Sequence, residues 1–68
     1  MNIKDDIKKK DIIKFLNKKE EWFTLNQIKT SLGIHIYKAE LLLYQLLYEG
    51  KVELDKRGKF NFWRLKNE

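Results

Sequence analysis

The 68-residue sequence contains neither cysteine nor proline, and it has a single histidine. Without cysteine the chain has no disulfide framework and no thiolate metal ligand, and His35 has no second histidine with which to bind a metal ion. Because no proline and no linker rich in glycine and serine interrupts the chain, we expect one domain over residues 1–68. So small a core must be stabilised by dense packing, helped by self-association.

Long apolar runs are missing as well. The longest, from Leu41 to Tyr44, has four residues, whereas a membrane-spanning helix needs about 20. The lysines near the N-terminus are not followed by the apolar region of a signal peptide. We therefore expect an intracellular, cytoplasmic protein without membrane contact.

Patterns that carry catalysis are equally scarce. The glycines Gly33, Gly50 and Gly58 are isolated, so the sequence has no glycine-rich loop that could cradle a phosphate. The neighbours Asp5-Asp6 and Glu20-Glu21 would diverge by about 100° on a helix, which prevents a shared acid and base. The sequence predicts a protein that is not an enzyme and has no cofactor, no metal site and no small-molecule substrate.

The sequence is rich in positively charged residues. Fifteen lysines and arginines stand against ten acidic residues, which gives a net charge of +5 and a pI near 9.5. Such a surface suits phosphate groups or an acidic protein partner, and it also favours solubility. With 43% hydrophobic residues the chain is expected to fold, because disordered chains are usually poorer in them.

Apolar spacing predicts a first helix from Asp5 or Asp6 to about Lys19. The side chains expected on its core side are Ile12, Ile13, Phe15 and Leu16. Ile3 and Ile7 point elsewhere, so residues 1–9 are expected to overhang as a frayed arm or as a contact for another chain. The lysines spread around this helix and are expected to be solvated; they are Lys8, Lys9, Lys10, Lys14, Lys18 and Lys19.

Two further helices follow a short extended pair, Trp22-Phe23. Thr24-Leu25-Asn26-Gln27 matches a capping box, in which the threonine hydroxyl and the glutamine side chain bind each other's backbone amides. The helix that starts there is expected to end at Gly33, which can adopt the left-handed conformation. A third helix is predicted from His35 or Ile36 to Glu49 and is ended by Gly50.

The C-terminal part predicts a β-hairpin. Residues 51–54 alternate as a strand, residues 55–58 supply turn chemistry, and residues 59–65 form a second strand rich in aromatic side chains. Phe60 and Phe62 share one face of that strand, while Trp63 and Leu65 share the other. A bulge could direct residues of both sets inward, so the inward face stays open at this point.

This order of elements resembles the winged helix-turn-helix family from Asp11 to Leu65. The residues that carry the resemblance are the turn Leu32-Gly33-Ile34, the small Ala39, and Leu43, Leu46, Gly50 and Val52. The resemblance implies an α+β fold of three helices with a C-terminal two-stranded β-hairpin wing. It also implies a small transcriptional regulator that binds double-stranded DNA, with helix 35–49 in the major groove and the wing 51–65 on the backbone.

One subgroup of that family binds left-handed Z-form nucleic acid. Leu43-Tyr44-Gln45-Leu46 and Trp63 resemble its tyrosine and tryptophan signature. Glu40 stands where the subgroup has an asparagine, and Asn61 and Phe62 replace its prolines. Because a carboxylate repels phosphate, Z-form binding is not the expected activity.

The resemblance places the DNA-binding residues on the wing and on the third helix. The basic wing residues are Lys51, Lys56, Arg57, Lys59 and Arg64, and phosphate contacts from such side chains position a protein without reading sequence. On the helix, the core side is expected to contain Ile36, Ala39, Leu42, Leu43, Leu46 and Leu47. Tyr37, Leu41, Tyr44 and Tyr48 form an opposite, outward tyrosine stripe, and Lys38 and Gln45 lie on one flank.

Two interpretations of the tyrosine stripe remain open. Tyrosine can donate to phosphate and its ring can meet thymine methyl groups, which favours contact with DNA. A continuous exposed apolar stripe is equally typical of a protein interface. Together with the Ile3 and Ile7 arm, this apolar stripe favours a homodimer. The alternative function is a protein interaction module that uses the stripe.

Overall fold

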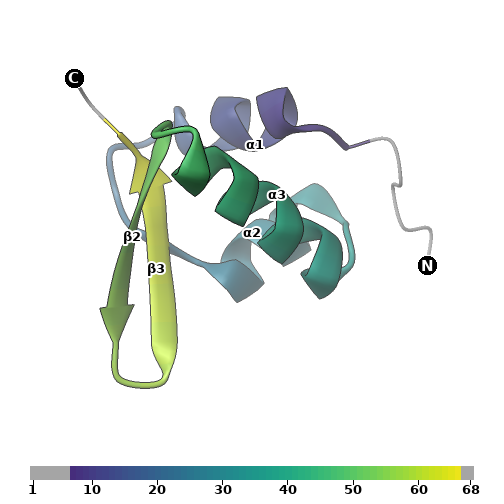
Figure 1. Ribbon diagram of the computed structural model, residues 1–68. Helices are drawn as coiled ribbons and strands as arrows, with labels where there is room; N and C mark the ends of the chain where they lie inside the picture. The colour runs from purple at the N-terminus through teal and green to yellow at the C-terminus, as the bar shows by residue number, and fades with distance from the viewer. Residues whose placement is uncertain (1–6, 67–68) are drawn as a thin grey trace.

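The computed structural model describes residues 7–66, which form three helices and a three-stranded antiparallel sheet (Figure 1). The elements are α1 (Lys9–Leu16), β1 (Phe23–Thr24), α2 (Leu25–Leu32), α3 (Ile36–Tyr48), β2 (Val52–Arg57) and β3 (Phe60–Leu65). The strands lie in the order β1-β3-β2, so the hairpin gains β1 as a third, short strand. The predicted α+β architecture of three helices and a hairpin is confirmed.

Helix α1 is shorter than predicted at both ends. It begins at Lys9 because the Asp11 carboxylate accepts a hydrogen bond from the backbone amide of Lys8 at 2.8 Å, which supplies an N-terminal cap. It ends at Leu16, and residues 17–21 turn the chain toward β1. The expected start at Asp5 or Asp6 lies outside the described residues, and the expected extension to Lys19 is wrong.

The expected overhang of residues 1–9 is wrong for its last part. Ile7 is partly buried and packs against the core, and Lys9 is the first residue of α1. Ile3 lies outside the described residues. Residues 7–9 therefore belong to the folded body of the protein.

Helix α2 starts and stops where the sequence predicts. The Thr24 hydroxyl accepts from the Gln27 amide at 3.1 Å, and the Gln27 side-chain oxygen accepts from the Thr24 amide at 2.8 Å. Gly33 ends the helix with φ +67°, a left-handed conformation that glycine adopts without a steric penalty. Three residues, from Gly33 to His35, separate α2 from α3.

Helix α3 is capped by His35, whose Nδ1 accepts from the Tyr37 amide at 3.2 Å. Its buried side chains are Ala39, Leu42, Leu43 and Leu46, as the periodicity predicts. Ile36 was expected with them but is 39% exposed. The reason is its place at the very first position of the helix, where it lines a surface groove together with the start of α2 and the wing.

The hairpin has a longer first strand and a tighter turn than predicted, and its second strand begins one residue later, at Phe60. Arg57 pairs with Phe60, so the loop consists of Gly58 and Lys59 alone, and the expected turn at residues 55–58 is wrong. Gly58 has φ +60° and no other residue type has a positive φ within the described chain, which makes this a type II′ turn. Such a turn matches the strand twist, so pairing continues almost to the tip.

The pairing register also settles the inward face of the hairpin. Trp63 lies opposite Phe23 on one side and Leu54 on the other, and it is 1% exposed. The helices cover this face of the sheet, while the hairpin tip projects beyond them (Figure 1). The side chains buried completely with Trp63 are Ile12, Leu16, Ile28, Leu43, Leu46 and Val52. No helix of the described residues is long and apolar enough to cross a membrane.

Candidate nucleic-acid interface

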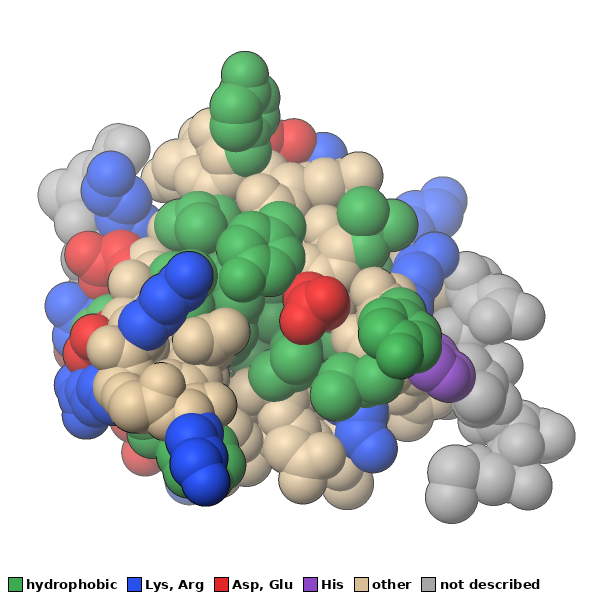
Figure 2. Space-filling view, turned by 60° about the horizontal axis from the view of Figure 1, so that its bottom comes forward, with side chains coloured by type: hydrophobic (Ala, Val, Ile, Leu, Met, Phe, Trp, Pro, Cys, Tyr) green, Lys and Arg blue, Asp and Glu red, His purple; other side chains and the backbone are tan. Residues whose placement is uncertain are grey.

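The tyrosine stripe lies on the side of α3 that faces away from the core. The exposed fractions are 73% for Tyr37, 57% for Leu41, 40% for Tyr44 and 94% for Tyr48. Figure 2 shows hydrophobic side chains gathered on one face, an acidic side chain among them and basic ones toward the margins. The predicted stripe is therefore a continuous outward surface with little charge of its own.

Tyr44 differs from the rest of the stripe because it also packs against the sheet. Its ring meets the Trp63 indole edge-on, with centroids 5.3 Å apart and an interplanar angle of 89°. Such edge contacts stabilise by about 0.5–1.5 kcal/mol beyond area burial. Since Trp63 itself is buried, the indole has no surface to offer a ligand.

The polar residues beside the stripe differ in their exposure to solvent. Gln45 is exposed, whereas Lys38 and Glu40 are half-buried. A half-buried carboxylate beside the apolar stripe lowers the electrostatic attraction of this face for phosphate. Base contact at the stripe would therefore depend on hydroxyl groups, Gln45 and ring surfaces more than on positive charge.

Three of the five predicted basic wing residues already have acidic partners. Nε of Arg57 lies 2.6 Å from the Asp55 carboxylate, and Nε of Arg64 lies 2.6 Å from Glu53. The third, Lys51, has its ammonium 3.8 Å from Glu49. These pairs are partly exposed, so each contributes little to stability. Their main effect is to reduce the positive potential of the wing.

The two arginines share the sheet face that points away from the helices. Arg64 lies over the Trp22 ring, 4.4 Å from its centroid. Arg57 lies 5.1 Å from the Phe62 centroid and 5.7 Å from that of Trp22. These contacts brace the hairpin against the segment that leads into β1. Trp22 is thus a structural residue that the sequence alone did not single out.

The remaining basic wing residues, Lys56 and Lys59, lie at the tip. Lys56 shares the strand face of Val52 and Leu54, the side toward the helices, and Lys59 is in the turn. Both are exposed, and neither has a carboxylate at ion-pair distance within the described residues. The predicted basic wing residues therefore lie on different faces of the hairpin: Lys56 is on the side toward the helices, whereas Arg57 and Arg64 are on the opposite side.

Glu49 connects the end of α3 to the start of α1. Its carboxylate accepts a hydrogen bond from Lys9 at 2.5 Å. This hydrogen bond, together with the charges of Lys9 and Lys51, lowers the pKa of Glu49 below its ordinary value of 4.5. Lys9, predicted as part of a solvated face, thus has a specific structural partner.

A groove lies between the wing, the start of α2 and the first residue of α3. It has a volume of about 340 Å³ and is lined by Thr24, Leu25, Asn26, Ile36, Lys59, Phe60 and Asn61. Ile36 and Phe60 are exposed there. Within residues 7–66, no group of three His, Cys, Asp or Glu side chains is placed to hold a metal ion.

Comparison with solved structures identifies one similar fold. A chain of HOP2 superposes with a TM-score of 0.79 over 85% of this chain and 97% of its own length, at 19% sequence identity. That structure is described in terms of DNA recognition, protein interaction domains and homologous DNA pairing by HOP2. This chain has the winged-helix fold. No protein-family model and no curated protein matches the sequence.

Proposed function

We propose that this winged-helix domain binds duplex DNA without catalysing a reaction, with α3 toward the major groove and the wing tip on the backbone. The observation that carries the proposal is the pair of exposed lysines at the wing tip, Lys56 and Lys59, which have no acidic partner among the described residues. The similarity of the fold to HOP2, whose structure is described as containing DNA recognition domains, supports it. The narrower role of a transcriptional regulator stays a prediction from sequence.

Binding of a short random-sequence duplex, measured over a series of salt concentrations, tests this proposal. We expect Lys56→Ala with Lys59→Ala to weaken binding equally for all sequences. The slope of log affinity against log salt should become shallower by about 1.8, since each phosphate contact contributes about 0.9. The pair is preferable to any change at Arg57, because that side chain also packs on aromatic rings.

The matched control removes the same charge from another element. Lys10 and Lys14 are exposed on α1, so Lys10→Ala with Lys14→Ala should leave the slope nearly unchanged. A folded protein that does not bind DNA at low salt would contradict the function. If the control variant reduced the slope of log affinity against log salt as much as the wing variant, DNA would lie on a different surface.

The tyrosine stripe supports a second candidate function, a protein or self-association interface. Tyr37, Leu41 and Tyr48 are each more than half exposed and make one apolar surface, and the neighbouring Glu40 does not favour phosphate. Surfaces of this kind are typical of protein contacts. The two candidate functions compete for the outward face of α3, because the tyrosine stripe is the surface that would face the major groove. The lysines of the wing tip stay available for phosphate contact in either case.

A further inference from the structure

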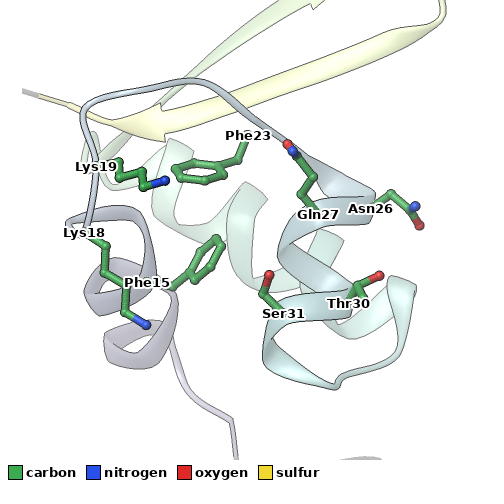
Figure 3. A pocket seen from close by; sticks show the side chains of 8 residues that line it. All are labelled: Phe15, Lys18, Lys19, Phe23, Asn26, Gln27, Thr30 and Ser31. Atoms are coloured by element: carbon green, nitrogen blue, oxygen red, sulfur yellow. The ribbon is translucent and has the colours of Figure 1, made fainter.

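A pocket of about 480 Å³ lies between α1 and α2, on surfaces that the proposed DNA interface does not use (Figure 3). Its lining comes from the end of α1 and the turn after it, from β1 and from α2: Phe15, Lys18, Lys19, Phe23, Asn26, Gln27, Thr30 and Ser31. This volume falls within the range of sites for small organic ligands, about 300–1,000 Å³.

Two aromatic rings form the apolar part of the pocket. Phe15 and Phe23 have centroids 5.0 Å apart and planes tilted by 52°. Phe23 is buried, whereas Phe15 is only half-buried, so part of its ring faces the open pocket. A flat apolar group can cover that ring and remove it from water.

Two lysines supply the charge of the pocket. The Lys18 ammonium lies 5.9 Å from the Phe15 centroid, and Lys19 extends toward the Phe23 ring (Figure 3). Among residues 7–66 no acidic side chain lines the pocket, and neither lysine has a carboxylate of that part of the chain at ion-pair distance. An anion would therefore meet two positive charges next to an aromatic surface.

The wall opposite the lysines offers neutral hydrogen-bonding groups. Gln27 uses its side-chain oxygen to accept from Thr24, which fixes the amide and leaves its NH₂ group to donate. The hydroxyl groups of Thr30 and Ser31 lie on the same helix. Such donors suit a carboxylate and give the pocket a polar side facing its apolar one.

We propose that this pocket binds a small organic anion with a planar apolar body, such as an aromatic carboxylate. The planar group covers the exposed part of the Phe15 ring, beside Phe23, and the carboxylate lies between the ammonium groups and the donors of α2. The ligand would join α1 to α2 and stabilise the folded state. This site is separate from the proposed DNA interface, so the test of ligand binding and the test of DNA binding have independent outcomes.

A matched pair of probes tests the site in the full chain. 1-Naphthaleneacetate and 1-naphthaleneacetamide share the same ring and differ in charge. Titration followed by amide chemical shifts should show saturable changes at residues 15–31 at up to millimolar probe concentrations. We expect the carboxylate to bind about fivefold more tightly than the amide, the effect of a favourable exposed ion pair. Lys18→Gln with Lys19→Gln should abolish that difference.

Two further variants make the test specific. Lys10→Gln with Lys14→Gln removes the same charge from α1 outside the pocket and should preserve the preference for the carboxylate. Ser31→Phe fills the pocket from an exposed position and should block both probes while the protein stays folded. The proposal is overturned if no saturable shift occurs, if both probes bind equally, or if the shifts lie on α3 instead.

Discussion

Trp63 is the residue that joins the sheet to the helices. It is buried at the centre of the three strands, and the edge contact with Tyr44 connects it to α3. Its indole Nε1 is buried without an acceptor among the described residues, and an unmade hydrogen bond of this kind costs about 1–3 kcal/mol. The size of the ring offsets this cost, because a fully buried aromatic side chain removes a large apolar area from water.

Glu49 gives a prediction about pH. The pKa of this carboxyl is lowered in the folded state by Lys9, so its contribution to stability is present above the unfolded pKa and is lost as pH falls through the folded value. Glu49→Gln should therefore lower the urea midpoint near neutral pH. This difference from the parent protein should shrink once the pH falls below the ordinary value of 4.5.

Urea unfolding at a series of pH values, together with the titration of the Glu49 carboxyl carbon by NMR, measures this effect. Glu21 is an exposed carboxylate in the turn before β1, and Glu21→Gln serves as the matched control without such a partner in the described chain. A Glu49→Gln difference that stayed constant down to strongly acidic pH would show that the side chain acts through packing and not through its charge.

At the scale of the element, the wing depends on its turn. Gly58 has φ +60°, and nothing lies within 4 Å of the position that a Cβ would occupy, so an alanine there would be strained only through its backbone. We expect Gly58→Ala to lower the unfolding free energy by about 1 kcal/mol and to speed amide exchange in β2 and β3.

Lys59 provides the control in the same turn. Its φ is not positive, so Lys59→Ala should change the unfolding free energy by no more than about 0.5 kcal/mol. Thermal unfolding and hydrogen exchange measure both variants. Equal losses of unfolding free energy in the Gly58→Ala and Lys59→Ala variants would show that the tip of the wing does not hold the type II′ conformation.

At the scale of the whole molecule, the exposed tyrosine stripe predicts a homodimer. If α3 associates with a second copy, the melting temperature should rise by roughly 3–5 °C for each tenfold increase in protein concentration, about 0.7 kcal/mol per chain. Leu41→Ser with Tyr48→Ser should remove that dependence. These two residues are preferable to Tyr44, which also packs on Trp63.

Sedimentation and melting curves over a range of concentrations provide the measurement, and Phe60→Ser, which removes an exposed ring from the wing, provides the control. A strict monomer at high micromolar concentration would rule out the dimer without affecting the fold. If the stripe variant instead loses discrimination among DNA sequences while its salt slope stays the same, the stripe contacts bases.

Much of this molecule was predictable because it follows from local interactions. The Thr24 and Gln27 cap, the end of α2 at Gly33 and the buried side of α3 depend on residues a few positions apart, and helical periodicity reports them directly. The outward position of the tyrosine stripe follows from the same periodicity.

Contacts distant in sequence could be decided only by the tertiary structure. The register of β2 and β3 places Glu53 beside Arg64, and the return of the chain through Trp22 places an aromatic ring under both arginines. The fold thus neutralises part of a wing that composition alone presents as strongly basic. Pairing across strands and helices depends on geometry that no single segment contains, because charges and rings interact through space and not along the chain.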